Sequence, residues 1–334
     1  MKHTFSIFLL LLLPLPTSAQ TERKMCLMEW NCENLFDTLH DYGKDDTQFL
    51  PDSEYAWNSG RYWHKLRNMA RTIMDAGGLN PVDIVALCEV ENDSVLHDLT
   101  HRTRMASLGY QYVIEDGPDL RGVDAALLYR PETFQLLSHA THPVPHDAEK
   151  ERPTRDVLHC SGVIPNRDTL DVIVVHFPSR RGGAKHSEGY RLRAAGVVRN
   201  IVDSLHSVRL HPAIVVMGDC NDEPSDRSLR LMEQGGLTNV SAAATAVGEG
   251  LTDKQLATIR GTYYYQREWN HIDNILVADA ALKRWRKTEC SIFAPHYLLE
   301  QNADGDFVPY RVYLGPHYHG GVSDHLPLLL DLWY

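Results

Sequence analysis

The stretch Ile214-Val215-Val216-Met217-Gly218-Asp219-Cys220-Asn221-Asp222 decides how the rest of the chain is interpreted. Its four apolar residues predict a buried strand, which a Gly-Asp pair ends. Because alternate residues of extended backbone share a side, Asp219 and Asn221 are expected to leave the strand end together. A carboxylate beside a carboxamide suits water activation near a hard cation such as Mg²⁺, not zinc. The same residues are also good turn formers, so the interpretation depends on what the other strand ends carry.

Residues 1–19 have the pattern of a secretory signal peptide. A basic residue, Lys2, precedes a nearly all-apolar run over residues 5–13, and Thr17-Ser18-Ala19 is typical of a cleavage site. The run is too short to span a bilayer. We therefore expect a secreted or periplasmic protein with no stable membrane insertion, in which residues 20–334 form a single catalytic domain.

The composition is that of an acidic globular protein. The 334 residues are 43% hydrophobic and 23% charged, with a net charge of −11. Removing residues 1–19 removes Lys2 and no acid, so −11 becomes −12. Such a chain has no broad electrostatic attraction for nucleic acid or anionic lipid, so a phosphate must be bound locally. The charge lowers the expectation of a sequence-specific DNA binder without excluding a nuclease.

The cysteines predict neither a zinc site nor a dense disulfide framework. No CxxC pair is present, and a secretory route permits disulfides without requiring them. Several cysteines lie in apolar runs, where a free thiol acts as a small core residue. We expect mostly unpaired, buried cysteines, at Cys26, Cys32, Cys88, Cys160, Cys220 and Cys290.

Apolar runs along the chain predict alternating strands and helices without repeats or linkers. The expected strands cover residues 25–30, 82–88, 110–115, 123–130, 155–163, 170–176 and 214–217. A short strand is also expected within 134–147, an apolar strand within 269–277, and a final strand that begins near 320. The expected helices cover residues 63–74, 94–107 and 187–207. Residues 293–320, rich in Tyr, His and Pro, are expected to form a long loop.

Polar residues stand at six predicted strand ends. Each has an ordinary structural explanation on its own, such as a turn former or a solvated acid. Polar residues without a functional role are found mostly in loops rather than in apolar strands, so we expect at least some of these residues to be functional. An acid inside an apolar strand is costly unless its charge is paired. The residues are Asn31, Glu89, His176, Asp219 with Asn221, Asp273, and Asp324 with His325.

The oxygen-bearing side chains among them suit a metal site. Glu89 and Asp324 can supply carboxylate oxygens to Mg²⁺, and Asn31 can add a neutral oxygen. A bound ion would polarise a phosphoryl oxygen and offset developing charge. Asp219 can orient or deprotonate a water molecule. We expect Mg²⁺ as the cofactor, with Mn²⁺ as a substitute.

Other side chains suit phosphate binding. His176 and His325 can donate to a phosphate if neighbouring carboxylates keep them cationic. Ser179, Arg180 and Arg181 add further donors for phosphate oxygens.

Six short motifs follow one another along the chain: Trp-Asn at 30–31, Cys-Glu at 88–89, His-Phe-Pro-Ser-Arg at 176–180, Gly-Asp-x-Asn at 218–221, His-Ile-Asp at 271–273 and Ser-Asp-His at 323–325. This ordered series resembles the endonuclease/exonuclease/phosphatase superfamily, over roughly residues 24–334. The tail from Pro309-Tyr310-Arg311 to Gly321 is similar to that of secreted bacterial, endonuclease-like members. The resemblance implies a DNase I-like α/β (α+β) four-layer sandwich, with two mixed, mostly antiparallel sheets packed face to face and helices outside.

The resemblance also implies roles for individual residues. It implies that Asp273 is the partner of His325 and, by a looser match, that Asp124 is the partner of His176. The implied catalytic residues are His176, Asp219, Asn221, Asp273 and His325; the implied metal ligands are Asn31, Glu89 and Asp324.

The expected function is that of a secreted, Mg²⁺-dependent phosphodiesterase or endonuclease, and we expect a monomer. Nucleic acid is the expected substrate, since Arg121, Arg155, Arg180 and Arg181 could follow a phosphate backbone. A phosphatase or phosphodiesterase on inositol phosphates or phospholipid head groups is the alternative, although no apolar hairpin for membrane docking is evident. A non-catalytic binding protein on the same fold is the alternative of another class.

Overall fold

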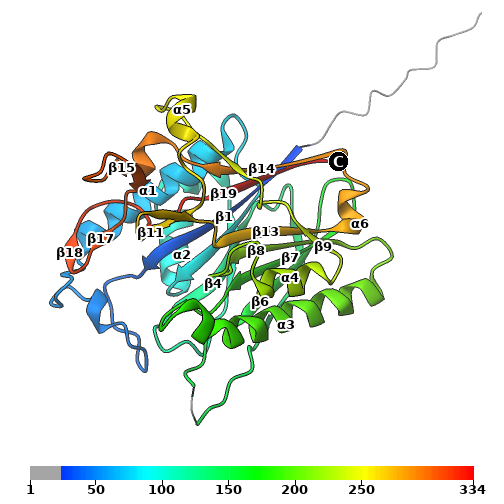
Figure 1. The fold of residues 1–334 in the computed structure, drawn as a ribbon, viewed down its shortest axis with the longest axis horizontal. Coiled ribbons are helices and arrows are strands. Elements are labelled where there is room, and N and C mark those ends of the chain that lie inside the picture. Colours follow the sequence, from blue (N-terminus) through cyan, green and yellow to red (C-terminus); the bar gives the residue numbers. More distant parts are fainter. Residues whose placement is uncertain (1–23, 150) are drawn as a thin grey trace, which may run out of the picture.

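Two β-sheets packed face to face form the centre of the molecule (Figure 1). The structure is a computed structural model, which describes residues 24–149 and 151–334. The first sheet has seven strands in the order β10 (Thr245–Val247), β14 (Lys287–Phe293), β19 (Leu328–Trp333), β1 (Lys24–Leu35), β2 (Ile84–Val90), β4 (Asp124–Tyr129) and β3 (Gln111–Ile114). The second has six, in the order β5 (Gln135–His142), β6 (Val157–Val163), β7 (Thr169–His176), β8 (Ala213–Asp219), β13 (Asp273–Ala278) and β9 (Leu237–Asn239).

Both sheets are mixed and mostly antiparallel. The parallel pairs are β1 with β2, β7 with β8, and β10 with β14. The inner faces meet where β1, β2 and β4 pack against β7 and β8. All seven residues of β8 are buried, as expected for a strand covered on both faces.

Helices lie on the outer sides of the two sheets and complete four layers (Figure 1). On one side, α3 (Ala184–Val208) packs with α4 (Arg227–Glu233); on the other, α1 (Ser59–Gly77) packs with α2 (Asp93–His101). The shorter helices are α5 (Asp253–Leu256) and α6 (Asp279–Leu282), with 3₁₀ turns η1 (Thr47–Phe49), η2 (Arg104–Leu108) and η3 (His296–Leu298). The predicted four-layer sandwich is confirmed.

The sequence of α1 explains where this helix begins and ends. The side chain of Asn58 accepts hydrogen bonds from the backbone N–H groups of Gly60 and Arg61, which caps the first turn. Leu66 and Ile73, at helical spacing, are fully buried against the sheet. Gly78 then adopts a φ of 62°, which favours glycine and ends the helix.

Several predicted element boundaries are corrected. Residues 293–320 do not form a loop, because they contain η3 and two hairpins, β15 (Leu299–Gln301) with β16 (Phe307–Pro309) and β17 (Tyr313–Leu314) with β18 (His317–Tyr318). The final strand starts at Leu328 instead of near 320, so Asp324 and His325 precede it. β1 continues past Asn31, and the helix predicted over 94–107 divides into α2 and η2.

The predicted state of the cysteines is confirmed. All six cysteines are free, and Cys26 and Cys290 alone among them are not fully buried. Within residues 24–149 and 151–334, no helix combines the length and the apolar character needed to cross a bilayer. The predicted signal peptide at residues 1–19 lies outside the described residues.

Candidate active site

Three site residues form one row across neighbouring strands of the six-stranded sheet. In the parallel pair β7–β8, His176 is opposite Asp219, and in the antiparallel pair β8–β13, Asp219 is opposite Asp273. Gly218 permits this close pairing, because a Cβ at that position would lie 1.8 Å from the carbonyl oxygen of Val175. The register of three strands therefore brings together residues that are far apart in the sequence.

The seven-stranded sheet supplies the opposite wall. Asn31 lies on β1, and Glu89 lies near the end of β2, where the pairing register is irregular on both sides. Glu89 has a φ of 63°, an uncommon conformation for a residue with a side chain, which turns its carboxylate out of the regular pleat. The backbone N–H of Asn34 donates to Glu89 Oε2 at 2.8 Å, and Arg121 donates to Oε1 at 3.1 Å.

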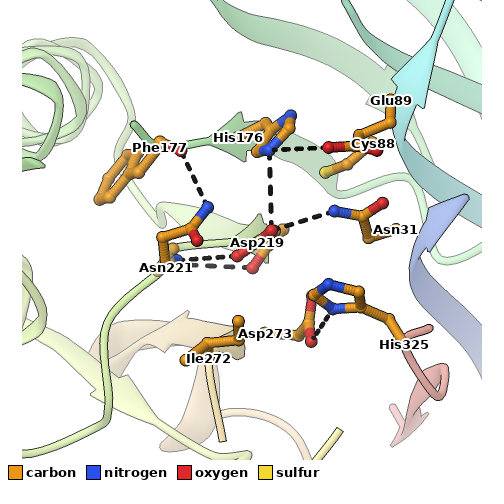
Figure 2. A network of polar contacts seen from close by, with 12 residues as sticks. Asn31, Cys88, Glu89, His176, Phe177, Asp219, Asn221, Ile272, Asp273 and His325 are labelled. Carbon is orange, nitrogen blue, oxygen red and sulfur yellow. Dashed lines mark hydrogen bonds and ion pairs between the residues drawn. The ribbon is translucent and has the colours of Figure 1, made fainter. Parts of the chain in front are cut away.

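A cavity of about 830 Å³ lies between these walls. Ten of the predicted site residues line it, while Asp273 lies behind His325 and Asp124 lies elsewhere. Figure 2 shows how the side chains from the two sheets converge. The lining residues from the predicted set are Asn31, Glu89, His176, Ser179, Arg180, Arg181, Asp219, Asn221, Asp324 and His325.

Asp219 is held by hydrogen bonds at both of its carboxylate oxygens. Oδ1 accepts the backbone N–H of Asn221 at 2.8 Å, and Oδ2 accepts the side-chain amide of Asn31 at 3.0 Å (Figure 2). Burial, together with the charge of Asp273, raises the pKa of Asp219 to about 7. A carboxyl group with this pKa can accept and return a proton near neutral pH.

His325 and Asp273 form a buried pair. Nδ1 of His325 lies 2.7 Å from Oδ2 of Asp273, and Thr262 donates its hydroxyl to the same oxygen. Burial alone would lower the pKa of His325, but the charge and hydrogen bond of Asp273 raise it well above the usual value. The ring of Tyr263 lies against His325, with the two centroids 4.7 Å apart. His325 is therefore a fixed, cationic donor.

His176 has the opposite character. Its Nε2 lies 3.6 Å from Asp219 Oδ2 and 3.8 Å from Glu89 Oε1, while its Nδ1 has no hydrogen-bond partner among the described residues. Burial and the nearby charge of Arg155 lower the pKa of His176 well below the usual value, so this ring is neutral. The expectation that carboxylates keep both histidines cationic holds for His325 alone.

The predicted pairing of Asp124 with His176 is wrong. Asp124, on β4, accepts a hydrogen bond from the backbone N–H of Gly117 at 3.1 Å. Asp124 is the first residue of β4, and its carboxylate holds the turn before this strand. No contact joins Asp124 to His176 in the described part of the chain.

Asp324 and Arg180 lie where they were predicted, but both have protein partners. Arg311 forms an ion pair with Oδ2 of Asp324. Nε of Arg180 donates to the carbonyl oxygen of Asn221 at 2.7 Å, and its guanidinium pairs with Asp226 at 2.8 Å. Arg180 thus positions the Asn221 loop, and its role as a phosphate ligand remains a prediction, as does that of Asp324 as a metal ligand.

Asn221 is fixed by both its backbone and its side chain. It adopts a φ of 49°, and its amide donates to the carbonyl oxygen of Phe177 at 3.0 Å (Figure 2). This bond ties the end of β8 to the loop after β7. The two strand ends that carry Asp219 and His176 therefore keep a constant spacing.

Sequence reasoning missed Arg311, Tyr263 and Glu29 as contributors to this site, and it did not predict the partner of Arg121. Arg121 neutralises Glu89, and Arg311 neutralises Asp324; neither arginine has a sequence signal for that task. Tyr263 reaches His325 from the hairpin β11 (Tyr263–Tyr265) with β12 (Glu268–Asn270), which the expected elements omitted. Glu29 is fully buried on β1, and the acid within the apolar run at 25–30 was a usable signal.

The donor set fits a hard divalent cation. Asn31, Glu89 and Asp324 bring a carboxamide and two carboxylates to the same cavity, without a thiol or a free imidazole pair. Asp219, Asp273 and His325 also place ligand atoms within 4.8 Å of one another. In that second group, Nδ1 of His325 is already hydrogen-bonded to Asp273. This group is therefore arranged to share a proton rather than to bind a metal ion.

The four-layer sandwich and a cavity that combines Asp219, hard oxygen ligands and a buried Asp–His pair fit a metal-dependent phosphoester hydrolase. Residues 26–333 match the family model of the Endonuclease/Exonuclease/phosphatase family, and the chain belongs to that family. A search of the curated proteins found no match to the chain.

Solved structures of other proteins have the same fold. A functionally unknown conserved protein from Enterococcus faecalis is similar with a TM-score of 0.59 and 19% identity, over 92% of this chain and 99% of that chain. TDP2 from C. elegans is similar with a TM-score of 0.55 and 14% identity, over 93% and 75%. A mannosyl-6-phosphatase from Bacteroides thetaiotaomicron is similar with a TM-score of 0.56 and 12% identity, over 93% and 100%.

Proposed function

We propose that this protein is an exported, Mg²⁺-dependent phosphodiesterase that cleaves nucleic-acid phosphodiesters. The observation that carries the proposal is the placement of Asp219 and the cationic His325 in one cavity with the oxygens of Asn31 and Glu89. A base, a donor and a set of hard ligands around one space are the parts that phosphoester hydrolysis needs.

Different residues of the site have different roles in the proposed reaction. Asn31, Glu89 and Asp324 would hold the ion, which supplies charge neutralisation for a phosphoryl oxygen. Asp219 is oriented by two hydrogen bonds and accepts the proton of the attacking water. His325 donates to a phosphoryl oxygen as negative charge develops in the transition state.

Aromatic side chains on the cavity wall favour nucleic acid over other phosphodiesters. Tyr263 and Tyr265 line the cavity with their rings stacked, the centroids being 6.2 Å apart, and Tyr265 is 55% exposed. Exposed rings beside a phosphate site can stack on bases without selecting a sequence. An acidic chain with local phosphate binding and a stacking surface suits a nuclease of low sequence specificity.

A substrate panel tests the proposal. The protein lacking residues 1–19 is incubated with Mg²⁺ and plasmid DNA, RNA, sphingomyelin, inositol phosphates or bis(4-nitrophenyl) phosphate. We expect cleavage of nucleic acid, and no cleavage by Asp219→Asn, which keeps the shape of the carboxyl but cannot act as a base. Turnover of inositol phosphates or sphingomyelin without cleavage of nucleic acid contradicts the proposed substrate, and no turnover of any phosphoester favours a binding protein.

The proposal also includes export as a monomer. The apolar run and small residues within 1–19 support cleavage after Ala19. N-terminal sequencing of the protein recovered outside the cytoplasm and its elution volume in size-exclusion chromatography test these two points. A retained N-terminus or a dimer contradicts them.

A further inference from the structure

A second cavity, of about 370 Å³, adjoins the catalytic one. Arg121, Ser179 and Arg181 line both cavities, so these side chains form the boundary between them. The second cavity lies between the start of α3 and the loop that joins β5 to β6, a loop that passes close to α3 in Figure 1. None of the predicted catalytic residues or metal ligands lines it.

The charges around this second cavity are predominantly positive. Five arginines and two acids line it, although the chain as a whole has a net charge of −11. Each acid is already neutralised, since Asp119 pairs with Arg155 at 2.9 Å and Glu151 pairs with Arg193 at 2.6 Å. Arg121 pairs with Glu89 and Arg152 with Asp45, so Arg181 is the one lining arginine that has no acidic partner among the described residues. Its charge attracts an anion.

Two of these arginines have unused hydrogen-bonding capacity. Arg181 is exposed and has no ion pair or hydrogen bond with any other described residue. Arg155 is buried, with 6% of its surface exposed, and its Nε has no hydrogen-bond partner in the described part of the chain. Hydrogen-bond donors without a partner beside a cavity are typical of a site that binds a ligand with hydrogen-bond acceptors, such as a phosphate.

The start of α3 adds to the attraction. Its N-cap residue, Gly183, provides no side-chain hydrogen bond to the first turn, so the first N–H groups lack a side-chain acceptor. Ser187 and Tyr190, from the first two turns, line the second cavity. A helix N-terminus favours negative charge through its dipole.

We propose that this cavity binds a second phosphate group of the substrate while the scissile phosphate lies in the catalytic cavity. The proposal rests on the proposed function and narrows it, because it predicts a substrate that carries at least two phosphates. An oligonucleotide and a polyphosphorylated polyol both have this chemistry. The experiment below distinguishes these two substrate classes by testing each in a separate arm.

The experiment compares substrates that differ only in the second phosphate. With Mg²⁺, kcat/KM is measured for the dinucleotide TpT and for its terminally phosphorylated forms pTpT and TpTp. A second arm compares inositol monophosphate with inositol bisphosphate. We expect the wild type to prefer the form with the additional phosphate by roughly tenfold or more, the loss typical of one charge-assisted contact.

Arg152 supplies a variant outside the catalytic cavity. It lines only the second cavity, its side chain is 75% exposed, and its partner is the surface residue Asp45 at 3.3 Å. Arg227 is a matched control, since its side chain is 70% exposed, pairs with Glu188 at 2.9 Å and lines neither cavity. We expect Arg152→Ala to reduce the preference for the additional phosphate several-fold without changing turnover of TpT, and Arg227→Ala to change neither.

Three results overturn the inference. The wild type could show no preference for the additional phosphate in either arm; Arg152→Ala could lower turnover of both forms equally; or Arg227→Ala could match Arg152→Ala. If the wild type cleaves no phosphoester, the proposed function fails, and titration calorimetry with pyrophosphate in EDTA then tests the cavity alone. Weaker binding by Arg152→Ala than by Arg227→Ala supports the cavity in that case, and equal binding rejects it.

Discussion

Nδ1 of His325 lies 2.7 Å from Oδ2 of Asp273, and this contact joins the two sheets of the molecule. Asp273 begins β13 of the six-stranded sheet, and His325 lies in the segment before β19 of the seven-stranded sheet. Asp273 is 0% exposed and His325 is 6% exposed. Because Asp273 is fully buried and His325 nearly so, each charge depends on the other for compensation.

The first prediction concerns this pair as a unit. His325→Ala should lower kcat by roughly 10² or more with a smaller effect on KM, because one preorganised donor to the transition state is lost. Asp273→Asn keeps the shape but removes the charge that holds His325 cationic, so it should also lower kcat. The double variant should be far from additive, because both residues act through one imidazolium. Near wild-type kcat in His325→Ala, or additive losses, contradicts this role.

The second prediction concerns the metal. EDTA should abolish activity, and Mg²⁺ or Mn²⁺ should restore it, because the oxygens of Asn31, Glu89 and Asp324 are hard ligands. Glu89→Gln should raise the Mg²⁺ concentration needed for half-maximal activity. Asp124→Asn is the control, since that acid holds a turn and should leave both kcat and the Mg²⁺ requirement unchanged. Full activity in EDTA on any phosphoester argues against the metal site.

The members of this site were predictable from the sequence, but their contacts were not. Asn31, Glu89, His176, Asp219 and His325 each stand at an apolar run, which is a local pattern. In the structure, His176 lies beside Asp219, and Asp219 lies beside Asp273. This arrangement depends on the register of three strands, which the local sequence pattern does not determine.

The errors in the predicted site arose because several site residues have partners in distant segments of the chain. Arg121 and Arg311 neutralise site acids through tertiary contacts, and no spacing in the sequence relates either one to its partner. The pairing of Asp124 with His176 was predicted wrongly for the same reason, because tertiary contacts cannot be read from the sequence. The hairpins within 293–320 were missed because strands of two or three residues are too short to show a period of two.

The third prediction concerns Glu29. It is fully buried, and neither carboxylate oxygen has a hydrogen-bond partner among the described residues. Burial and the charges of Asp273 and Asp219 raise the pKa of Glu29 well above its usual value. Glu29→Met should therefore raise the free energy of unfolding at pH 7 by about 1 to 3 kcal/mol, because a buried polar group without a partner is removed.

Urea denaturation of Glu29→Met and of Glu33→Met tests this prediction. Glu33 is the matched control, because its carboxylate accepts backbone N–H groups of Val312 at 2.7 Å and of Tyr313 at 3.4 Å. Glu33→Met should lower the free energy of unfolding where Glu29→Met raises it. A loss of stability in Glu29→Met of the same size as in Glu33→Met rejects the assignment of Glu29 as an uncompensated acid.

The fourth prediction concerns stability at low pH and a buried acid outside the active site. Asp171 is 0% exposed and accepts hydrogen bonds from His159 at 3.0 Å and from Arg209 at 3.0 Å. Burial alone would raise the pKa of Asp171, but the hydrogen bonds from His159, Arg209 and Ser161 hold it below the usual value. Asp171→Asn should therefore lower the free energy of unfolding by about 2 kcal/mol at pH 7.

The sign of the pH dependence follows from the lowered pKa of Asp171. Between the folded and unfolded pKa values the unfolded chain binds the proton, so the contribution of this carboxylate is complete above about pH 4 to 5 and declines as the pH falls. The difference in urea midpoint between wild type and Asp171→Asn should be largest at pH 7 and smaller at pH 3. Asp304→Asn is the control, because its pair with Arg267 is exposed and should contribute little at either pH. A difference for Asp171→Asn that is constant from pH 7 to pH 3 means that the carboxylate charge does not stabilise this part of the sheet.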